Sequence, residues 1–192
     1  ANPGRIIRLS ANESALGPSP KAIAAFEAVS GDLYRYPDGS SGSLRAALAS
    51  LHGLDADKIV CGAGSDELIY NLVRAYAGPG DEVLYSEHGF NIYPIAALSV
   101  GASPVTASET NLTADVDALL ARVTDKTKIV FIANPNNPTG SYVPVEEMAR
   151  LRRRLPAATL LVIDSAYAEY VIRNDYSPGI ELVDAGENTV MT

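Results

Sequence analysis

From residue 44 onward, helical segments alternate with short apolar segments that have the character of strands. The first expected helix has Leu44, Leu48 and Leu51 on one face, and further helices are expected at 65–77, 90–99, 115–123 and 145–155. The expected strands cover 59–61, 82–86, 103–105, 129–133, 160–164 and, incompletely, 189–192. This alternation is typical of an α/β protein in which helices cover both faces of a mainly parallel sheet. Ligands of such proteins bind beyond the carboxyl ends of the strands, so those ends are the candidate sites.

The first 42 residues differ in texture from the rest of the chain. Turn signals surround Gly17-Pro18 and Pro37-Asp38-Gly39, and they leave room for one short helix over 22–29. This pattern predicts an arm at 1–42 and one large domain at 43–192, because the chain is long enough for little more than one domain.

The composition limits the binding partners that we expect for this protein and the cellular compartment in which we expect it. The 192 residues include 23 acidic and 15 basic side chains, which gives a net charge of -8. This charge disfavours binding to nucleic acid or to anionic lipid. The apolar runs are much shorter than the roughly 20 residues that span a bilayer, and the N-terminus lacks the apolar stretch of a signal peptide. The single cysteine, Cys61, forms no internal disulfide, so we expect a cytoplasmic protein.

Three of the expected strand ends carry residues that are suited to binding a ligand. The first is the glycine-rich turn Cys61–Glu67, where small residues and free N–H groups at a helix start favour a phosphate. A dinucleotide-binding turn would need glycine in place of Glu67, and no P-loop lysine follows. The alternative is that Ser65 only caps the helix.

The other two ends are the segment Asn134–Gly140 and Asp164 with Tyr167. An asparagine held in a loop stiffened by two prolines offers an uncharged amide donor, although the segment is also compatible with a simple turn. An acid at the end of a buried strand invites a positively charged ligand atom, such as a protonated pyridine nitrogen. A capping role for Asp164 and a packing role for Tyr167 are the alternatives.

Taken together, the segments GAGSDE, NPNNPTG and VIDSAY resemble the large domain of the fold-type I pyridoxal-phosphate aminotransferases. The segments LSANESALGPSPKA, YRYPDGSSGSLRAALA and EHGFNIY are similar, more narrowly, to the histidinol-phosphate aminotransferase family. The resemblance covers nearly the whole chain. It implies a three-layer αβα sandwich, with 1–42 as an arm and small-domain segment and 43–192 as a cofactor domain that stops before its last strands.

The resemblance also assigns roles to individual residues. Gly64, Ser65 and Asp66 are expected to hold the phosphate of pyridoxal 5'-phosphate, mainly through backbone N–H groups. Phe90, where the family usually has tyrosine, would stack on the pyridine ring. The family resemblance further implies that Asn137 and Tyr167 bind the phenolic oxygen and that Asp164 pairs with the ring nitrogen. It also implies that Tyr36 touches the phosphate in the neighbouring subunit of a homodimer. The Asn137-Pro138 peptide is expected to be cis for the same reason. Ser165 departs from the glutamate that the family commonly has there.

The catalytic lysine of the family has no counterpart in this chain. Aminotransfer needs a lysine that holds the cofactor as a Schiff base and shuttles a proton. The four lysines, Lys21, Lys58, Lys126 and Lys128, all lie outside the family's Ser-Lys segment, which is expected beyond Thr192. Lys58 and Lys128 precede strands at the amino edge of the sheet, opposite the expected crevice, and Lys126 lies in a polar turn. No residue of the chain is therefore expected to be the catalytic lysine, and the fragment alone is expected to be inactive.

The expected reaction of the full-length enzyme is transfer of the amino group between histidinol phosphate and 2-oxoglutarate/glutamate, in histidine biosynthesis. Relatives that act on aromatic amino acids or decarboxylate a phosphorylated amino acid, and a non-catalytic domain of the same fold, are the alternatives. Several residues receive simpler interpretations. We expect the arginines at 150 and 152–154 to form a solvated face, His88 to make a structural hydrogen bond, and His52 and Cys61 to bind no metal.

Overall fold

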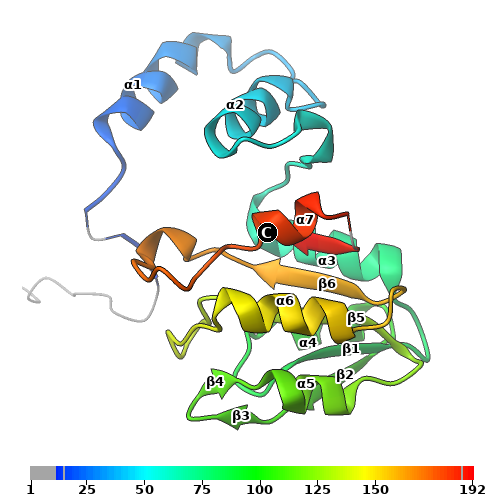
Figure 1. Cartoon of the computed structure of the whole chain (residues 1–192). Helices are drawn as coiled ribbons and strands as arrows, with labels where there is room; N and C mark the ends of the chain where they lie inside the picture. Colours follow the sequence, from blue (N-terminus) through cyan, green and yellow to red (C-terminus); the bar gives the residue numbers. More distant parts are fainter. Residues whose placement is uncertain (1–11, 15, 187) are drawn as a thin grey trace, which may run out of the picture. The chain divides into compact units, whose positions relative to one another are not determined.

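The computed structural model describes residues 12–14, 16–186 and 188–192, and it divides the chain into two compact units, 1–59 and 60–192 (Figure 1). The sequence pattern changes earlier, near residue 43. The domain boundary expected between residues 42 and 43 stays a prediction. The first unit contains α1 (Pro20–Val29), η1 (Ser30–Asp32), α2 (Gly42–His52) and η2 (Ala56–Lys58).

Local signals explain the helices of the first unit. Ser19 caps α1 by accepting a hydrogen bond from the backbone N–H of Ala22, and Pro20 fits the first helical position. Helix α2 ends at Gly53, whose φ of 69° is the left-handed conformation that favours glycine. No described residue of this unit is buried. The helix expected over 22–29 is thus confirmed.

The second unit is built on a five-stranded sheet whose strands are all parallel. The strands are β1 (Glu82–Ser86), β2 (Ser103–Ala107), β5 (Thr127–Ala133), β6 (Leu160–Asp164) and β7 (Thr189–Met191), in the spatial order β2-β1-β5-β6-β7. A separate antiparallel hairpin joins β3 (Glu109–Thr110) to β4 (Thr113–Ala114). The structure confirms the expected α/β class.

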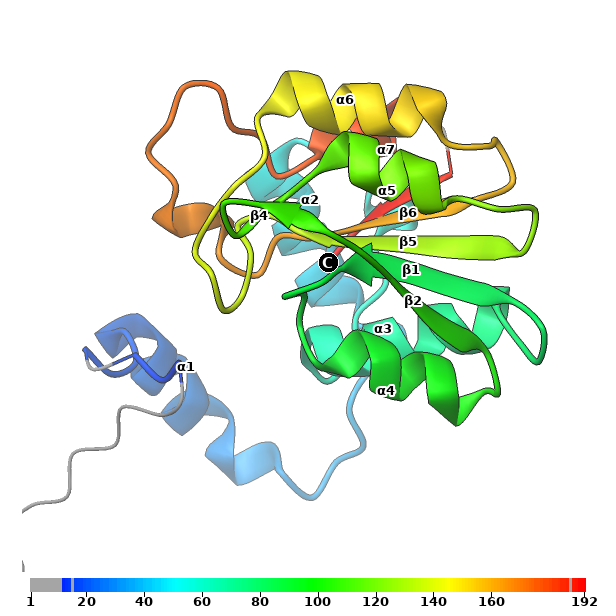
Figure 2. The ribbon, with the colours of Figure 1, turned by 90° about the horizontal axis from the view of Figure 1, so that it is seen from below.

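Helices cover both faces of this sheet, as Figure 2 shows. They are α3 (Gly64–Tyr76), α4 (Ile92–Ser99), α5 (Val116–Arg122), α6 (Val145–Arg154) and α7 (Ile180–Asp184), with a short η3 (Ala168–Tyr170) after β6. Within the described residues, no helix combines the length and the apolar character that a membrane crossing requires.

The two-residue period of the strands divides the core into two layers. In β5, Ile129 and Phe131 pack in the layer that contains residues of α3 and α4, whereas Val130 and Ile132 pack in the layer that contains residues of α5 and α6. Strand β6 alternates in the same way. This arrangement confirms the three-layer αβα sandwich.

The strand order reverses between β1 and β5. The chain passes from β1 through α4 to β2 at one edge, and then returns through α5 to β5 on the other side of β1. Two neighbouring strands that leave in opposite directions open a crevice at their carboxyl ends. The segments that follow β1, β5 and β6 therefore converge at this end of the sheet.

Three local expectations differ from the structure. Residues 59–61 form no strand in the described sheet, and Val60 is 76% exposed, because no neighbouring strand pairs with this segment. Helix α4 begins at Ile92, so Phe90 lies in the preceding turn. The β3–β4 hairpin and α7 lie in segments for which no element was expected.

Arg152 corrects the expectation of a solvated arginine face on α6. Its side chain is 3% exposed, and its guanidinium donates to the backbone carbonyls of Leu155, Pro156, Thr159 and Asn188. These carbonyls lie past the end of α6, where backbone acceptors lack helical partners. Arg153 and Arg154 are exposed as expected.

Candidate active site

A pocket lies at the carboxyl ends of β5 and β6, next to the turn after β1 and the first turn of α3. Its volume is about 90 Å³. The residues that line it come from four separate segments of the chain: Ser65, Asp66, Phe90, Ala133, Pro135, Asn137, Asp164, Ala166 and Tyr167. Six of the eight residues predicted from the sequence as cofactor contacts are among them.

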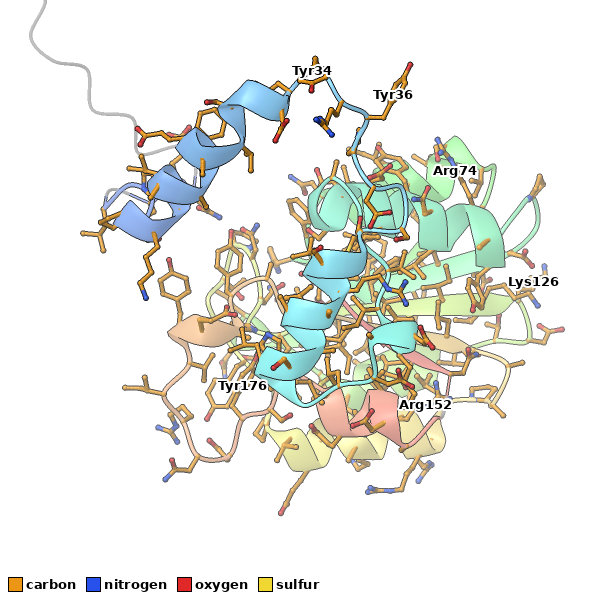
Figure 3. All side chains as sticks on the ribbon, turned by 90° about the horizontal axis from the view of Figure 1, so that it is seen from above. Tyr34, Tyr36, Arg74, Lys126, Arg152 and Tyr176 are labelled. Carbon is orange, nitrogen blue, oxygen red and sulfur yellow. The ribbon has the colours of Figure 1, made fainter. Side chains whose placement is uncertain are left out.

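The two remaining candidates are Gly64 and Tyr36. Gly64 is the first residue of α3 and directly precedes Ser65, although it does not line the pocket itself. Tyr36 belongs to the first unit, where it projects from the segment between α1 and α2 and is fully exposed (Figure 3). Its contact with a neighbouring subunit stays a prediction.

The first turn of α3 presents uncapped backbone donors to the pocket. The N-cap residue is Ala63, which has no capping side chain, so Ser65 does not cap this helix. The carboxylate of Glu67 accepts a hydrogen bond from the N–H of Ala63 and thereby fixes the start of the helix. Gly64 has a φ of 76°, a conformation that favours glycine. Ser65 and Asp66 follow as the next two residues, and helix starts of this kind favour anions.

Asp164 ends β6 and is the buried acid of the pocket, with 6% of its surface exposed. Its Oδ2 accepts a 2.8 Å hydrogen bond from the hydroxyl of Tyr93, and its Oδ1 accepts a 3.3 Å bond from the N–H of Ala166. Burial raises the pKa of Asp164, the charge of Asp66 raises it further, and the two hydrogen bonds oppose this shift. No lysine or arginine within the described residues forms an ion pair with Asp164. The carboxylate is thus suited to a cationic ligand atom.

Aromatic rings form the wall beside this acid. Phe90 meets the ring of Tyr93 edge to face, with 6.0 Å between ring centroids and an interplanar angle of 89°. Tyr93 is completely buried and stacks on Phe131 at 4.6 Å. At the preceding residue, Gly89, a Cβ would lie 3.0 Å from the carbonyl oxygen of Ser86, so a side chain there would require a small shift of the backbone. The tight turn therefore determines where Phe90 enters the pocket.

The loop after β5 is held by its own side chains and by a distant tyrosine. The amide of Asn134 exchanges two hydrogen bonds with the backbone of Val143, and the hydroxyl of Tyr176 donates to the carbonyl oxygen of Asn134 at 2.8 Å. The Asn137-Pro138 peptide is cis as expected, and the Asn134-Pro135 peptide is also cis. This framework places Asn137 in the pocket wall, where its amide bonds to no other described residue.

A second network joins this loop to the turn after β1. Asn136 donates to the carbonyl oxygen of His88 at 3.1 Å, and Glu109 accepts hydrogen bonds from both the backbone N–H and the ring Nδ1 of His88. His88 thus makes the structural contacts expected of it. The β3–β4 hairpin, which carries Glu109, braces the segment from which Phe90 emerges.

Tyr93, Tyr176 and Glu109 hold residues of the pocket or of its loops in place, and the sequence pattern did not predict these contacts. Tyr93 had a usable signal, since it lies three residues after Phe90 in an expected helix, where side chains share a face. Tyr176 and Glu109 lie in segments without a recognised pattern.

None of the four lysines lines the pocket. Lys126 lies in the turn before β5, far from the Tyr176 side of the unit (Figure 3), and Lys128 is the second residue of β5. Five residues of strand, roughly 16 Å, separate Lys128 from Ala133 at the pocket. Lys128 pairs with Asp81 at 3.9 Å. Lys21 and Lys58 belong to the first unit. The structure thus confirms the expected place of Lys128 at the amino edge.

Comparisons with known proteins agree with this geometry. A histidinol-phosphate aminotransferase of Paramagnetospirillum magneticum is 64% identical over 187 residues, which are 97% of this chain and 52% of that protein. One from Rhodospirillum centenum is 59% identical, over 98% of this chain and 52% of the relative. The chain thus spans about half the length of the curated relatives it matches.

The structural similarity extends to a protein solved with a cofactor. The crystal structure of histidinol-phosphate aminotransferase from Sinorhizobium meliloti in complex with pyridoxal-5'-phosphate superposes with a TM-score of 0.84 at 34% identity, over 88% of this chain and 46% of that one. The family model described as aminotransferase class I and II matches residues 4–192. The chain therefore belongs to the class I and II aminotransferase family.

Proposed function

We propose that the complete protein containing this chain is a pyridoxal-phosphate-dependent aminotransferase of histidine biosynthesis. It would transfer the amino group between histidinol phosphate and 2-oxoglutarate/glutamate. The observation that carries the proposal is the convergence of a buried acid, an aromatic ring and an open helix start on one pocket. The identity of 54–64% to proteins named histidinol-phosphate aminotransferase supports the substrate.

The described residues fit this cofactor at three separate points. A pyridine ring carries a basic nitrogen, and Asp164 is a buried carboxylate without an ion-pair partner among the described residues. The ring needs an apolar face, which Phe90 can provide. The phosphate needs several N–H donors, and the first turn of α3 has them at Ser65 and Asp66.

When bound, pyridoxal phosphate supplies the electron sink that makes a hydrogen on the α-carbon of an amino substrate acidic. Asp164 would accept a hydrogen bond from the protonated ring nitrogen and so keep the proton there. Asn137 and Tyr167 would donate hydrogen bonds to the phenolic oxygen. Phe90 would cover one face of the ring and exclude water from it. Gly64, Ser65 and Asp66 would fix the phosphate and thereby the orientation of the ring.

The remaining parts of the machinery are also proposed from the family. We infer that the lysine that binds the cofactor and moves the proton lies outside these 192 residues, and that the chain alone does not transaminate. We further propose that the enzyme works in the cytoplasm as a homodimer in which Tyr36 reaches the phosphate of the neighbouring subunit.

The test uses the complete gene product. The protein is incubated with pyridoxal phosphate, reduced with borohydride and mapped by peptide mass spectrometry. We expect one reduced adduct on a lysine outside residues 1–192, together with transfer of the amino group from histidinol phosphate to 2-oxoglutarate. An adduct on Lys21, Lys58, Lys126 or Lys128 would contradict the placement of the lysine. Faster turnover of aromatic amino acids than of histidinol phosphate would contradict the substrate.

A further inference from the structure

The phenol of Tyr93 is the buried partner of the acid in the pocket. Tyr93 is 0% exposed, and its hydroxyl donates to Oδ2 of Asp164 at 2.8 Å, a side-chain contact between residues 71 positions apart. A buried hydroxyl needs a hydrogen-bond partner, and a buried carboxylate needs donors. Each of these two groups therefore satisfies the other.

The ring of Tyr93 is fixed on several sides. It stacks on Phe131 with an interplanar angle of 7°, and it meets Tyr85 edge-on at 6.1 Å between centroids. Phe90, in the pocket wall, lies against it at 89°. A ring held in this way has little freedom to move its hydroxyl, so the direction of the hydrogen bond to Asp164 is set by the core.

The two carboxylate oxygens of Asp164 differ in how strongly they are hydrogen-bonded. Oδ2 is engaged by Tyr93 at 2.8 Å, whereas Oδ1 has only the longer, 3.3 Å contact from the N–H of Ala166. Oδ1, whose one hydrogen bond is the longer, is therefore the less strongly engaged of the two oxygens. The bond from Tyr93 also opposes the effect of burial on the pKa of Asp164 and favours the ionised carboxylate.

We propose that Tyr93 is a positioning residue that holds Asp164 so that Oδ1 faces the ring nitrogen of the cofactor, and that through its contact with Phe90 it links the acid to the stacking wall. This inference rests on the proposed function, because it requires a pyridine ring in the pocket. Tyr93 itself does not line the pocket. It acts through Asp164 and Phe90.

The experiment compares two cofactors in the complete protein. Pyridoxal phosphate has the ring nitrogen, and its 1-deaza analogue has carbon at that position. Because Tyr93 acts on the contact with the nitrogen, Tyr93→Phe should weaken binding of pyridoxal phosphate roughly tenfold, the effect of one hydrogen bond to a charged group. The same variant should change binding of the deaza analogue less than about twofold.

Tyr85→Phe is the matched control, because it removes a hydroxyl from the same aromatic cluster and does not touch Asp164. Both cofactors should bind this variant as they bind the wild type. Equal losses for the two cofactors in Tyr93→Phe, or no loss for either, would overturn the positioning role and leave the proposed function in place. Failure of the wild-type protein to bind pyridoxal phosphate would overturn the proposed function itself.

Discussion

The hydroxyl of Tyr176 donates a 2.8 Å hydrogen bond to the carbonyl oxygen of Asn134, and so ties the segment after β6 to the loop after β5. Burial raises the pKa of Tyr176 to about 12, so the phenol keeps its proton near neutral pH. The ring also packs against Tyr142, with 6.2 Å between centroids. The loop that carries Asn137 is therefore held from a segment about forty residues away.

Tyr176→Phe should lower the free energy of unfolding by about 1 kcal/mol, the usual contribution of one hydrogen bond. Urea denaturation measures this change. Tyr142→Phe is the control, because the Tyr142 hydroxyl donates only to the exposed Asp175. Its effect should stay within about 0.5 kcal/mol. Equal effects of the two variants would contradict a specific role for the Asn134 contact.

Asp164→Asn should stabilise the cofactor-free protein near neutral pH. The pKa of Asp164 is higher in the folded state than its ordinary value of 3.8, mainly because of burial. The folded state therefore binds the proton more tightly, and stability falls as pH rises from the unfolded pKa through the folded pKa. Asparagine carries no charge and avoids this loss.

Thermal melting of both proteins from pH 4 to pH 7 tests this prediction. The advantage of Asp164→Asn should grow as the pH rises and should be smallest at pH 4. An advantage that is independent of pH would show that the charge of Asp164 is not the cause.

Phe90→Ala should weaken binding of pyridoxal phosphate about tenfold, because the pocket loses the face of an aromatic ring. Phe90→Tyr keeps that face and adds a hydroxyl, so its affinity should stay within about twofold of wild type. Fluorescence titration of the complete protein measures both. A loss in Phe90→Tyr as large as that in Phe90→Ala would argue against stacking.

Gly89→Ala should cost about 1–2 kcal/mol in the free energy of unfolding, because the new methyl group meets the backbone oxygen of Ser86 at 3.0 Å. Gly78→Ala adds the same methyl group where nothing lies within 4 Å, and it should change stability by less than about 0.5 kcal/mol. Chemical denaturation compares the two variants. If they behave alike, the turn before Phe90 is not under steric restriction.

Arg152→Met should lower the free energy of unfolding by about 3 kcal/mol, since it leaves buried backbone carbonyls without their charged donor. Arg153→Met, at an exposed position of the same helix, should cost less than about 0.5 kcal/mol. Circular dichroism during urea unfolding gives both values. A small effect at Arg152 would mean that water replaces the guanidinium.

Local sequence patterns were sufficient for most of the sheet. Strands β1 and β6 have the predicted bounds, because each contains an apolar run that ends at a polar residue. Residues 59–61 have a similar composition, yet they form no strand in the described structure. Strand formation depends on a neighbouring strand, and composition does not reveal which neighbour is present.

The candidate site was likewise predicted from the sequence only in part. Ser65, Phe90, Asn137 and Asp164 could be proposed because they follow expected strands or lie in a family motif. Tyr93 was missed although it lies three residues after Phe90, because its importance comes from a contact with Asp164 across 71 residues of sequence. The burial of Arg152 was missed for a similar reason, since two of the carbonyls that accept from it, those of Thr159 and Asn188, lie 7 and 36 residues away.

The alternation of side chains in β5 and β6 separates substitutions in the core from substitutions in the pocket. Interior residues such as Phe131 and Ile163 fill the two helix layers, one in each, whereas most pocket residues lie at or beyond the last position of a strand. A substitution beyond a strand end leaves no cavity in either layer, so its energetic cost stays local. A loop position of this crevice can therefore change its chemistry while the packing of the two layers beneath it stays the same.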